Sequence, residues 1–438
     1  MSNRRPIRFS LTILASACAA ITIAACGGGS DAPPYSPAQP TAFVPLAEKL
    51  PAGASEYDKH MQIARIAWAG NDDITQPHWC ANPGTGGNPQ LQDRSVIAIT
   101  ELFDGFYFTG SVSVGQFVMK TADGGYMLFD TMNNSSDVQN ITIPQLQSAG
   151  IDPVALRALI VTHGHGDHDG GAAELQSRFN PAITVVGSAD YSATKTYQAT
   201  LKIDSTNPTP QTLTIGGKTL IAVATPGHTP GTTSYIVPVT YKGQQHRLAY
   251  WGGSAFPGTA AAARQYMQGA EAMYTLIKAQ KVDGSINSHT FEDKSLNRIR
   301  AIQAQGGTAN GNPMIQGTSK IQLGFAVLRS CSAAQLFNRD ATVRNSVWRP
   351  TKVEFYDAGR GGSGLVVAAR VSNYFNVLAD AKVKFTAADG ATCTATTNRE
   401  GVASCAMGAS TGLVTAEFDG RSEADGIDLA SSATRTVN

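Results

Sequence analysis

The chain has little charge of either sign, and the two signs nearly cancel. Only 15% of its 438 residues are charged, and 34 basic residues against 33 acidic ones leave a formal net charge of +1. The sequence also has no long basic run. Because a nucleic-acid backbone is bound mainly by clustered Lys and Arg, this composition argues against a nucleic-acid partner. Small neutral or mildly charged molecules are better suited as substrates.

The apolar run near the start of the chain is too short to span a membrane comfortably. It extends from Leu11 to Ala25 and follows Arg4, Arg5 and Arg8. A basic segment followed by an apolar one is the layout of a secretory signal, so we exclude it from the fold. The sequence therefore predicts an exported protein.

The end of this run, IAAC at residues 23–26 followed by GGGS, resembles the lipobox of bacterial lipoproteins. The resemblance implies that residues 1–26 are a lipoprotein signal and that Cys26 is acylated. The protein would then be anchored by lipid at the cell envelope, on the periplasmic or surface side of the outer membrane. Several acyl chains anchor durably, because each buried CH₂ contributes about 0.8 kcal/mol. An ordinary cleaved signal, which leaves a soluble protein, is the alternative.

Six cysteines are present, and four remain once one is assigned to the removed signal and Cys26 to the lipid. Outside the cytoplasm these four can pair. Cys393 and Cys405 flank a predicted hairpin, which leaves Cys80 for Cys331. Four cysteines allow three arrangements, and free buried thiols are the alternative.

From about residue 95, short apolar strands alternate with helix-like segments, which predicts a mixed α/β layer fold. Strands at 116–120 and 126–130 flank Asp-Gly-Gly, a turn suited to positive φ, and should form a hairpin. The apolar strand Ala158–Val161 runs into a histidine cluster, and a helix is predicted directly after it at Gly170–Phe179. Further strands are predicted at 183–186, 219–223, 234–239 and 247–251, and helices at 260–280 and 294–305.

After about residue 345 only strand-like stretches separated by turn signals remain, which is the pattern of a small β-sandwich. Residues 380–405 resemble bacterial immunoglobulin-like repeats of surface proteins. Residues 27–45 are rich in Gly, Pro and Ser and are predicted to be a flexible tether. We therefore expect a signal at 1–26, a tether at 27–45, a catalytic domain at 46–345 and an immunoglobulin-like β-sandwich at 346–438.

The residues that carry chemistry are concentrated in THGHGDHDGG at 162–171, with three histidines and two aspartates within seven residues. Neutral imidazoles and carboxylates are ligands that zinc prefers, and alternate glycines let the backbone bend around an ion. His163 and His165, two residues apart, can project to one side. A polar loop whose histidines only form hydrogen bonds is the alternative.

The motif H-x-H-x-D-H with its trailing Gly-Gly resembles the signature of the metallo-β-lactamase fold superfamily, over about residues 95–330. The resemblance implies an α/β fold, the αββα sandwich, in which two β-sheets lie face to face with helices outside and the site at the sheet edge. His228, in TPGHTPG at a strand end, matches the third ligand segment, although a turn histidine is the alternative. His289, in Asn-Ser-His, matches the last ligand by order and context.

The resemblance also implies two zinc ions and assigns their ligands. His163, His165 and His228 would hold one ion, and Asp167, His168 and His289 would hold the other. Zinc lowers the pKa of bound water toward about 7, so a metal-bound hydroxide can attack a carbonyl without a serine or cysteine nucleophile. Asp167 would also orient this nucleophile and pass its proton to the leaving group.

Other polar residues have weaker assignments. Asp130, at a strand end, matches a family position that supports the ligands from behind, and a turn-forming aspartate is the alternative. His60, His78 and His246 lie in no comparable context and are predicted to be solvated or structural.

Ser254 occupies the place where many superfamily members carry an aspartate that bridges both metals. A serine there looks most like the third subclass of metallo-β-lactamases, and an ordinary loop serine is the alternative. That subclass commonly has a second serine two places on, which receives the β-lactam carboxylate, whereas this chain has Phe256.

The sequence thus predicts an exported zinc-dependent hydrolase that opens a β-lactam or a similar cyclic amide or ester. A lactonase or another esterase of the same fold is the first alternative. The second is an anchored binding or adhesion protein whose metal domain is inert.

Overall fold

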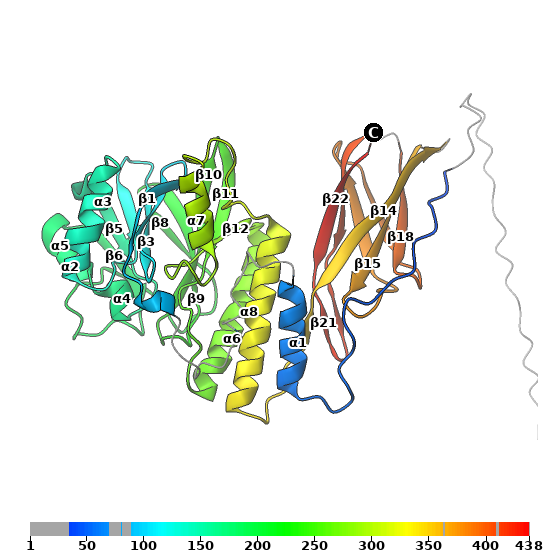
Figure 1. Cartoon of the computed structure of the whole chain (residues 1–438), viewed down its shortest axis with the longest axis horizontal. Helices are drawn as coiled ribbons and strands as arrows, with labels where there is room; N and C mark the ends of the chain where they lie inside the picture. Colours follow the sequence, from blue (N-terminus) through cyan, green and yellow to red (C-terminus); the bar gives the residue numbers. More distant parts are fainter. Residues whose placement is uncertain (1–34, 70–79, 81–88, 362–363, 409–410, 438) are drawn as a thin grey trace, which may run out of the picture.

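The structure is a computed structural model that describes residues 35–69, 80, 89–361, 364–408 and 411–437. The predicted signal, Cys26 and His78 lie outside these residues. Figure 1 shows three parts side by side: a two-sheet domain, a layer of three long helices, and a region built only of strands. Within the described part of the chain, no helix is both long and apolar enough to cross a bilayer.

Two β-sheets form the first domain. The larger sheet has seven strands in chain order, β1 (Val96–Phe103), β2 (Phe106–Ser111), β3 (Gly115–Lys120), β4 (Tyr126–Phe129), β5 (Leu156–Ile160), β6 (Ile183–Gly187) and β7 (Leu201–Ile203). The smaller sheet has five, in the order β12 (Gly284–Ile286), β11 (Gln244–Tyr250), β10 (Thr233–Tyr241), β9 (Lys218–Ala224) and β8 (Gln211–Ile215). The predicted hairpin is β3–β4, which pairs Lys120 with Tyr126 around Gly124 at φ +84°.

The two sheets pack face to face through a shared core of aromatic and aliphatic side chains. Phe117 and Phe129 of the larger sheet contact Tyr250 of the smaller one, with ring centroids 5.5 and 5.8 Å apart. Helices α3 (Ile143–Ser148) and α5 (Ala172–Phe179) supply side chains to the cluster on the outer face of the larger sheet. The layers are therefore those of the predicted αββα sandwich.

Short helices and turns complete this domain. They are the 3₁₀ turns at Pro89–Gln92 and Pro153–Ala155, α2 (Ser135–Asp137), the π-helical turn at Val138–Thr142, α4 (Gly166–Asp169) and α7 (Ser295–Ala304). The residues Leu296, Ile299 and Ile302 of α7 belong to the core between the sheets.

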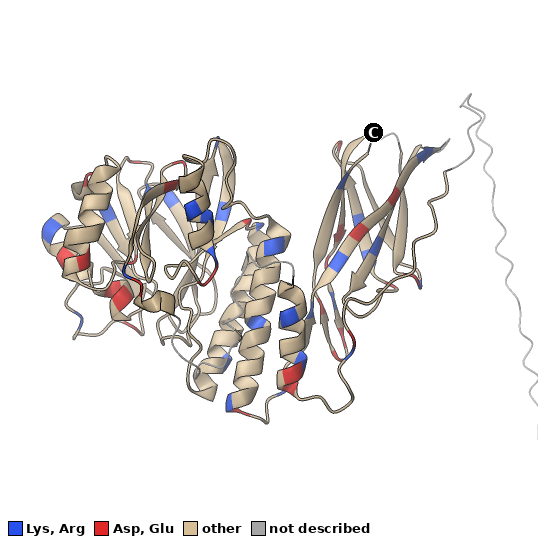
Figure 2. Ribbon diagram, in the orientation of Figure 1, with Lys and Arg blue, Asp and Glu red and all other residues tan. Residues whose placement is uncertain are grey.

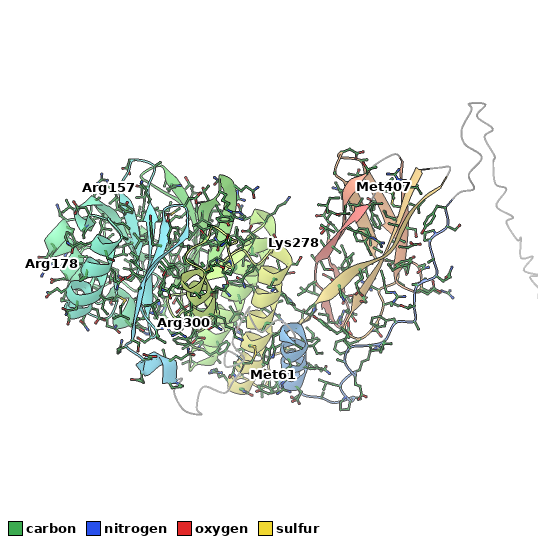
Figure 3. The ribbon with its side chains drawn as sticks, turned by 45° about the horizontal axis from the view of Figure 1, so that its top comes forward. Met61, Arg157, Arg178, Lys278, Arg300 and Met407 are labelled. Carbon is green, nitrogen blue, oxygen red and sulfur yellow. A yellow bond between two sulfur atoms is a disulfide. The ribbon has the colours of Figure 1, made fainter. Side chains whose placement is uncertain are left out.

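Two long helices, α6 (Ala260–Gln280) and α8 (Thr318–Arg339), pack on the outer face of the smaller sheet, and a third, α1 (Glu56–Trp68), packs on α8. The bounds predicted for α6 from the sequence agree with the structure. Helix α8 lies in the middle of the layer, between α6 and α1 (Figure 1). Met61 of α1, labelled in Figure 3, packs with Val327 and Cys331 of α8.

The C-terminal region is a sandwich of two facing sheets around one apolar core. One sheet has the order β14 (Thr351–Gly361), β15 (Gly364–Asn373), β18 (Val402–Gly408), and the other β17 (Thr392–Thr396), β16 (Lys382–Ala387), β19 (Gly412–Phe418), β22 (Ser431–Val437). A small third sheet holds β13 (Val347–Arg349), β21 (Gly426–Asp428) and β20 (Arg421–Glu423). The β-sandwich prediction thus agrees with the structure, while the likeness to immunoglobulin-like repeats stays a prediction.

Two disulfides have the connectivity expected from the sequence, Cys80 with Cys331 and Cys393 with Cys405. The predicted hairpin between Cys393 and Cys405 is wrong. Cys393 lies on β17, which pairs with β16, and Cys405 lies on β18, which pairs with β15. This disulfide therefore joins the two sheets of the sandwich, because consecutive strands here cross from one sheet to the other.

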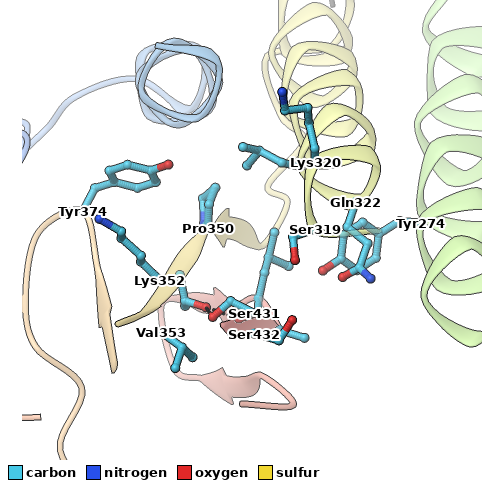
Figure 4. Close-up of a pocket in the computed structure, with 14 residues that line it drawn as sticks. Tyr274, Ser319, Lys320, Gln322, Pro350, Lys352, Val353, Tyr374, Ser431 and Ser432 are labelled. Atoms are coloured by element: carbon cyan, nitrogen blue, oxygen red, sulfur yellow. Dashed lines mark hydrogen bonds between the residues drawn. The ribbon is translucent and has the colours of Figure 1, made fainter. Parts of the chain in front are cut away.

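The junction between the helical layer and the sandwich is centred on Trp348 of β13. Its ring lies 5.0 Å from that of Tyr274 on α6, and the Arg329 guanidinium of α8 lies 4.8 Å above it. Beside this contact, a cavity of about 270 Å³ opens between α8 and β14, with Lys320 and Ser431 on its wall (Figure 4). The apolar cluster of the helical layer thus continues into the C-terminal region.

The described end of the predicted tether lies against the C-terminal sandwich. The Tyr35 hydroxyl donates to Asp357 at 2.7 Å, and the Ala38 N–H donates to the same carboxylate at 2.5 Å. Further along, the Leu46 N–H donates to the Tyr374 carbonyl at 2.9 Å. From Tyr35 onward this segment is therefore fixed by specific contacts, although its composition predicted a free tether.

Charged residues of both signs are interspersed along the ribbon of all three parts of the molecule (Figure 2). This distribution agrees with the near-zero net charge of the sequence.

Candidate active site

The predicted ligands meet at one edge of the two sheets, which α4 marks in Figure 1. Strands β4 and β5 are parallel, as are β11 and β12, so the carboxyl ends of each pair lie at the same edge. Asp130 follows β4 and His163 follows β5. His228 follows β9, and His289 follows β12. Residues far apart in the sequence are brought together because their strands end there.

The first group consists of His163, His165 and His228. One ring nitrogen from each of the three lies within 4.8 Å of the others. The Nδ1 atom of His163 lies 2.7 Å from the Gly252 carbonyl, and that of His228 lies 2.9 Å from the Ala255 carbonyl. Because a carbonyl oxygen only accepts, the proton of each ring is on Nδ1 and the lone pair is on Nε2.

The second group consists of Asp167, His168 and His289. The Nε2 atoms of the two histidines are 3.2 Å apart, and Asp167 Oδ2 lies 3.6 and 3.4 Å from them. His168 Nδ1 donates to Asp130 at 2.7 Å, and His289 Nδ1 donates to the Ser113 carbonyl at 2.6 Å. Both rings therefore turn their Nε2 atoms toward Asp167.

The electrostatic environment keeps most of these groups in the form that binds metal. Burial, followed by the charges of neighbouring histidines, holds the pKa of His163 well below its usual value, and burial lowers the pKa of His228 to about 4. Burial opposes charge on Asp167, but its hydrogen bond from His289 and the charge of His168 hold the pKa of the carboxyl below its usual value. Burial likewise opposes charge on His289, and the pairing with Asp167 outweighs it and raises the pKa of His289.

This donor set fits a divalent metal ion such as zinc. Imidazoles with one nitrogen hydrogen-bonded to an oxygen and the other free are the form in which histidine ligates metals. Without a cation between them, Nε2 atoms 3.1 Å apart on His163 and His228 would bring two lone pairs together. The chemistry of the donors therefore matches the expected cofactor, and it places His163 beside both groups.

Asp130 lies behind the ligands, in the supporting position that the sequence predicted. Its buried carboxylate accepts hydrogen bonds from the Thr162 N–H at 2.8 Å, from His168, from Tyr250 at 3.1 Å and from Ser288. Its backbone has φ +59°, which is uncommon for a residue other than glycine. The hydrogen bonds that the Asp130 carboxylate accepts stabilise this local conformation.

Ser254 lies near the segment that carries His289, and its side chain is bonded to that segment. The Ser254 hydroxyl donates to the Asn287 side-chain oxygen at 3.2 Å, and the same oxygen accepts the His289 N–H at 2.8 Å. Next to Ser254, the ring of Phe256 packs on Tyr266 at 5.0 Å between centroids. In this structure, Ser254 supports the loop of the last ligand.

Several groups at this site were not singled out from the sequence. The carbonyls of Ser113, Gly252 and Ala255 orient three of the histidines, and Tyr250 and Ser288 bind Asp130. Every residue has a backbone carbonyl, so the residue type does not indicate which carbonyl orients a histidine. Tyr250 and Ser288 reach Asp130 only because β4, β11 and β12 end together.

Among the described residues, the other two histidines, His60 and His246, form no hydrogen bond with the ligand cluster. His246 bonds to Asp283 at 2.6 Å. His60 of α1 is fully buried, and within the described residues neither of its ring nitrogens has a hydrogen-bond partner. The structural interpretation predicted from the sequence therefore agrees with both environments.

Comparison with known proteins decides the family of the first domain. Residues 113–241, which span the strands and loops that carry His163 to His228, match the family model of the metallo-β-lactamase superfamily. The chain carries a metallo-β-lactamase superfamily domain. The recognition made from the H-x-H-x-D-H motif is thereby confirmed.

Two curated relatives match parts of this chain. A hydroxyacylglutathione hydrolase of Acidiphilium cryptum is 28% identical over 169 residues, which cover 36% of this chain and 65% of the relative. A hydroxyacylglutathione hydrolase of Bartonella tribocorum is 37% identical over 83 residues, which cover 19% of this chain and 30% of the relative. The chain thus spans less than two thirds of either relative's length.

Solved structures of similar fold include a subclass B3 metallo-β-lactamase of Bradyrhizobium japonicum, with 21% identity and a TM-score of 0.45 over 57% of this chain and 98% of that one. The native FEZ-1 metallo-β-lactamase from Legionella gormanii has 15% identity and a TM-score of 0.47 over 56% of this chain and 98% of that one.

Proposed function

We propose that this protein is a zinc-dependent hydrolase that opens a β-lactam or a similar cyclic amide or ester. One observation carries the proposal: the six predicted ligands converge at one sheet edge, and four of the five histidines have Nδ1 hydrogen-bonded to oxygen. A protein that had lost the activity would be free to lose such ligands and their supporting bonds. Retention of the whole set supports an enzyme over an inert domain.

The side chains divide into two metal sites under this proposal. His163, His165 and His228 would hold one zinc ion, and Asp167, His168 and His289 the second. Bound zinc supplies Lewis-acid activation of water and of the substrate carbonyl near neutral pH. Asp167, ionised because its pKa is held low, accepts a hydrogen bond from the attacking water and orients it. Its side chain is partly exposed, so substrate and water can reach it.

The substrate class rests on Ser254. Ser254 stands where the bridging aspartate is expected, and its hydroxyl bonds to Asn287 at 3.2 Å. A serine where hydroxyacylglutathione-type relatives are expected to carry a bridging aspartate favours an amide or lactam over a thioester. Phe256, where the third subclass commonly has a serine, leaves the substrate carboxylate without that partner, so lactones and esters belong in the same test.

The test is metal analysis of the protein without its signal, combined with hydrolysis of three substrates before and after chelation. The substrates are a chromogenic cephalosporin, a simple lactone and a hydroxyacylglutathione. Two zinc ions with chelator-sensitive cephalosporin turnover would support the proposal in full. Zinc with turnover of only the lactone or the hydroxyacylglutathione would keep the hydrolase and overturn the β-lactam assignment. No bound zinc would favour the binding or adhesion protein.

We also propose that the protein is exported and anchored through Cys26, with the C-terminal sandwich nearest the membrane. The contacts of Tyr35 and Ala38 with Asp357 support this orientation. Cys26 precedes Tyr35 by nine residues, which span at most about 30 Å. Under this proposal the sandwich is a spacer between the membrane and the catalytic domain. The helical layer lies between the sandwich and that domain (Figure 1). Metabolic labelling with a fatty acid, lost in Cys26→Ser, would test the anchor.

A further inference from the structure

The loop between β6 and β7, residues 188–200, packs against both loops that carry the first group of ligands. It contributes no predicted ligand. Its Asp190 carboxylate accepts a hydrogen bond from the Gly164 N–H at 2.7 Å, and Gly164 stands between His163 and His165. The same carboxylate accepts from the Gly231 N–H at 2.7 Å and from the Thr229 hydroxyl at 2.5 Å.

These three bonds connect two segments that are far apart in the sequence. Gly164 belongs to the loop of His163 and His165, whereas Thr229 directly follows His228. One carboxylate therefore sets how far apart the two loops lie. All three hydrogen bonds are charge-assisted because their acceptor is a carboxylate, and such bonds are stronger than hydrogen bonds between neutral groups.

The surrounding backbone is shaped for this contact. A Cβ atom on Gly231 would lie 2.5 Å from Asp190 Cγ, and one on Gly164 would lie 3.0 Å from Asp190 Cβ. Real Cβ atoms do not approach as closely as 2.5 Å, so position 231 needs glycine for the carboxylate to reach its N–H group, and a side chain at position 164 would push Asp190 aside by a few tenths of an ångström. The close approach on both sides shows that Asp190 is packed between the two loops.

Lys195, from the same loop, binds the backbone carbonyl of Gly164. Its ammonium donates to the Gly164 carbonyl at 2.7 Å and to Asp169 at 2.5 Å, and Tyr197 donates to Asp169 at 3.2 Å. Asp190 and Lys195 thus hold the N–H and the C=O of one residue through opposite charges. The backbone between His163 and His165 is fixed at both ends.

We propose that Asp190 is a positioning residue that maintains the distance between the His163–His165 loop and the His228 loop, and thereby sets the affinity for the first metal ion. The inference rests on the proposed metal site. Supporting groups of this kind typically change metal affinity by about 10- to 100-fold when removed. Lys195 acts in the same direction through Gly164 alone, so its removal is expected to have the smaller effect.

The experiment measures zinc affinity by competition with a chromogenic chelator. The proteins are wild type, Asp190→Ala, Asp190→Asn and Lys195→Met. Asp190→Ala removes all three acceptor contacts and is expected to weaken binding of one zinc ion by about 10- to 100-fold. Asp190→Asn keeps one acceptor oxygen and should lie between Asp190→Ala and wild type. With saturating zinc, KM should change by less than about threefold, because Asp190 does not touch the substrate.

Asp204→Ala is the matched control. Asp204 lies on the next loop, is exposed, and accepts hydrogen bonds from the Thr206 N–H and hydroxyl at 2.9 and 2.7 Å, away from the ligand loops. Its removal should leave zinc affinity unchanged. Wild-type affinity in both Asp190 variants would overturn the inference while leaving the proposed function intact. A wild-type protein that binds no zinc would overturn the proposed function, and the inference with it. Circular dichroism identifies a variant that fails to fold, in which case Asp190→Asn decides.

Discussion

The ligand edge of the first domain and the core of the C-terminal sandwich are stabilised in different ways. At the ligand edge, buried polar groups such as His163 and Asp130 are each satisfied by specific partners. In the sandwich, the core is a cluster of apolar side chains such as Val383 and Phe385, and one disulfide joins the two sheets. Hydrogen bonds depend on direction, whereas apolar burial depends mainly on area. Substitutions at the edge should therefore change function, and substitutions elsewhere should change stability.

The largest effect should come from removing an exposed ligand. His165→Ala should reduce turnover by on the order of 1000-fold, because a bound metal supplies several kcal/mol of transition-state stabilisation. The side chain is exposed, so the melting temperature of the metal-free protein should hardly change. Initial rates and thermal melts of the two proteins check this, with His246→Ala as a histidine control outside the ligand cluster. Unchanged turnover in His165→Ala would contradict the assignment of His165 to the active site.

A substitution at the junction between the helical layer and the sandwich should lower stability and leave turnover nearly unchanged. Trp348→Ala should lower the free energy of unfolding by about 3–5 kcal/mol, because it leaves a cavity beside Tyr274 and Arg329. Turnover should stay within about threefold of wild type, since the ring of Trp348 contacts Tyr274 and Arg329 and none of the predicted ligands. Denaturant unfolding and kinetics measure the two effects. The exposed Lys352→Ala on the adjacent strand is the control, expected to change stability by less than about 0.5 kcal/mol.

The disulfide between the sheets should have the next largest effect. The double variant Cys393→Ser, Cys405→Ser opens a loop whose ends are 12 residues apart, which should lower stability by about 2–3 kcal/mol. Zinc content and turnover should not change, because the disulfide is confined to the sandwich. Calorimetry of the variant beside the oxidised and reduced wild type tests this. Loss of turnover without loss of stability would mean that the sandwich takes part in catalysis.

The smallest effect should be a pH dependence that arises at His60. Burial, with the charges of Arg329 and Lys59, lowers the pKa of His60 from 6.5 to about 3. The ring thus stays neutral in the folded state while it gains a proton in the unfolded state. Stability is then highest above pH 6.5 and falls as the pH drops toward 3, by about 2 kcal/mol at pH 5.

His60→Leu tests this pH dependence. The variant should lose less stability than wild type between pH 7 and 5, measured by denaturant unfolding at each pH. His246→Leu is the control, because His246 Nδ1 is bonded to Asp283, whereas neither ring nitrogen of His60 has a hydrogen-bond partner in the described part of the chain. Parallel losses in His60→Leu and wild type would show that His60 does not titrate in this way.

The sequence predicted the elements with a clear local pattern and missed those without one. Helix α6 was predicted with its observed bounds because apolar residues recur on one face. Helix α8 was missed, since it is buried on nearly every side from Ile321 to Leu336 between two other helices. A helix buried all round has no amphipathic stripe, so its periodicity is lost. The hairpin at Cys393 was predicted wrongly because sequence proximity does not show in which sheet a strand lies.

What the sequence by itself determined is the chemistry of the site. Ligating side chains must be particular residue types at short spacings, so the run from His163 to His168, with His228 and His289, could be recognised without coordinates. Only the tertiary structure decided which groups orient them. The Gly252 carbonyl and the Asp190 carboxylate reach the ligand loops from other loops of the domain. Their roles depend on distances across the fold, and such distances leave no local signal in a sequence.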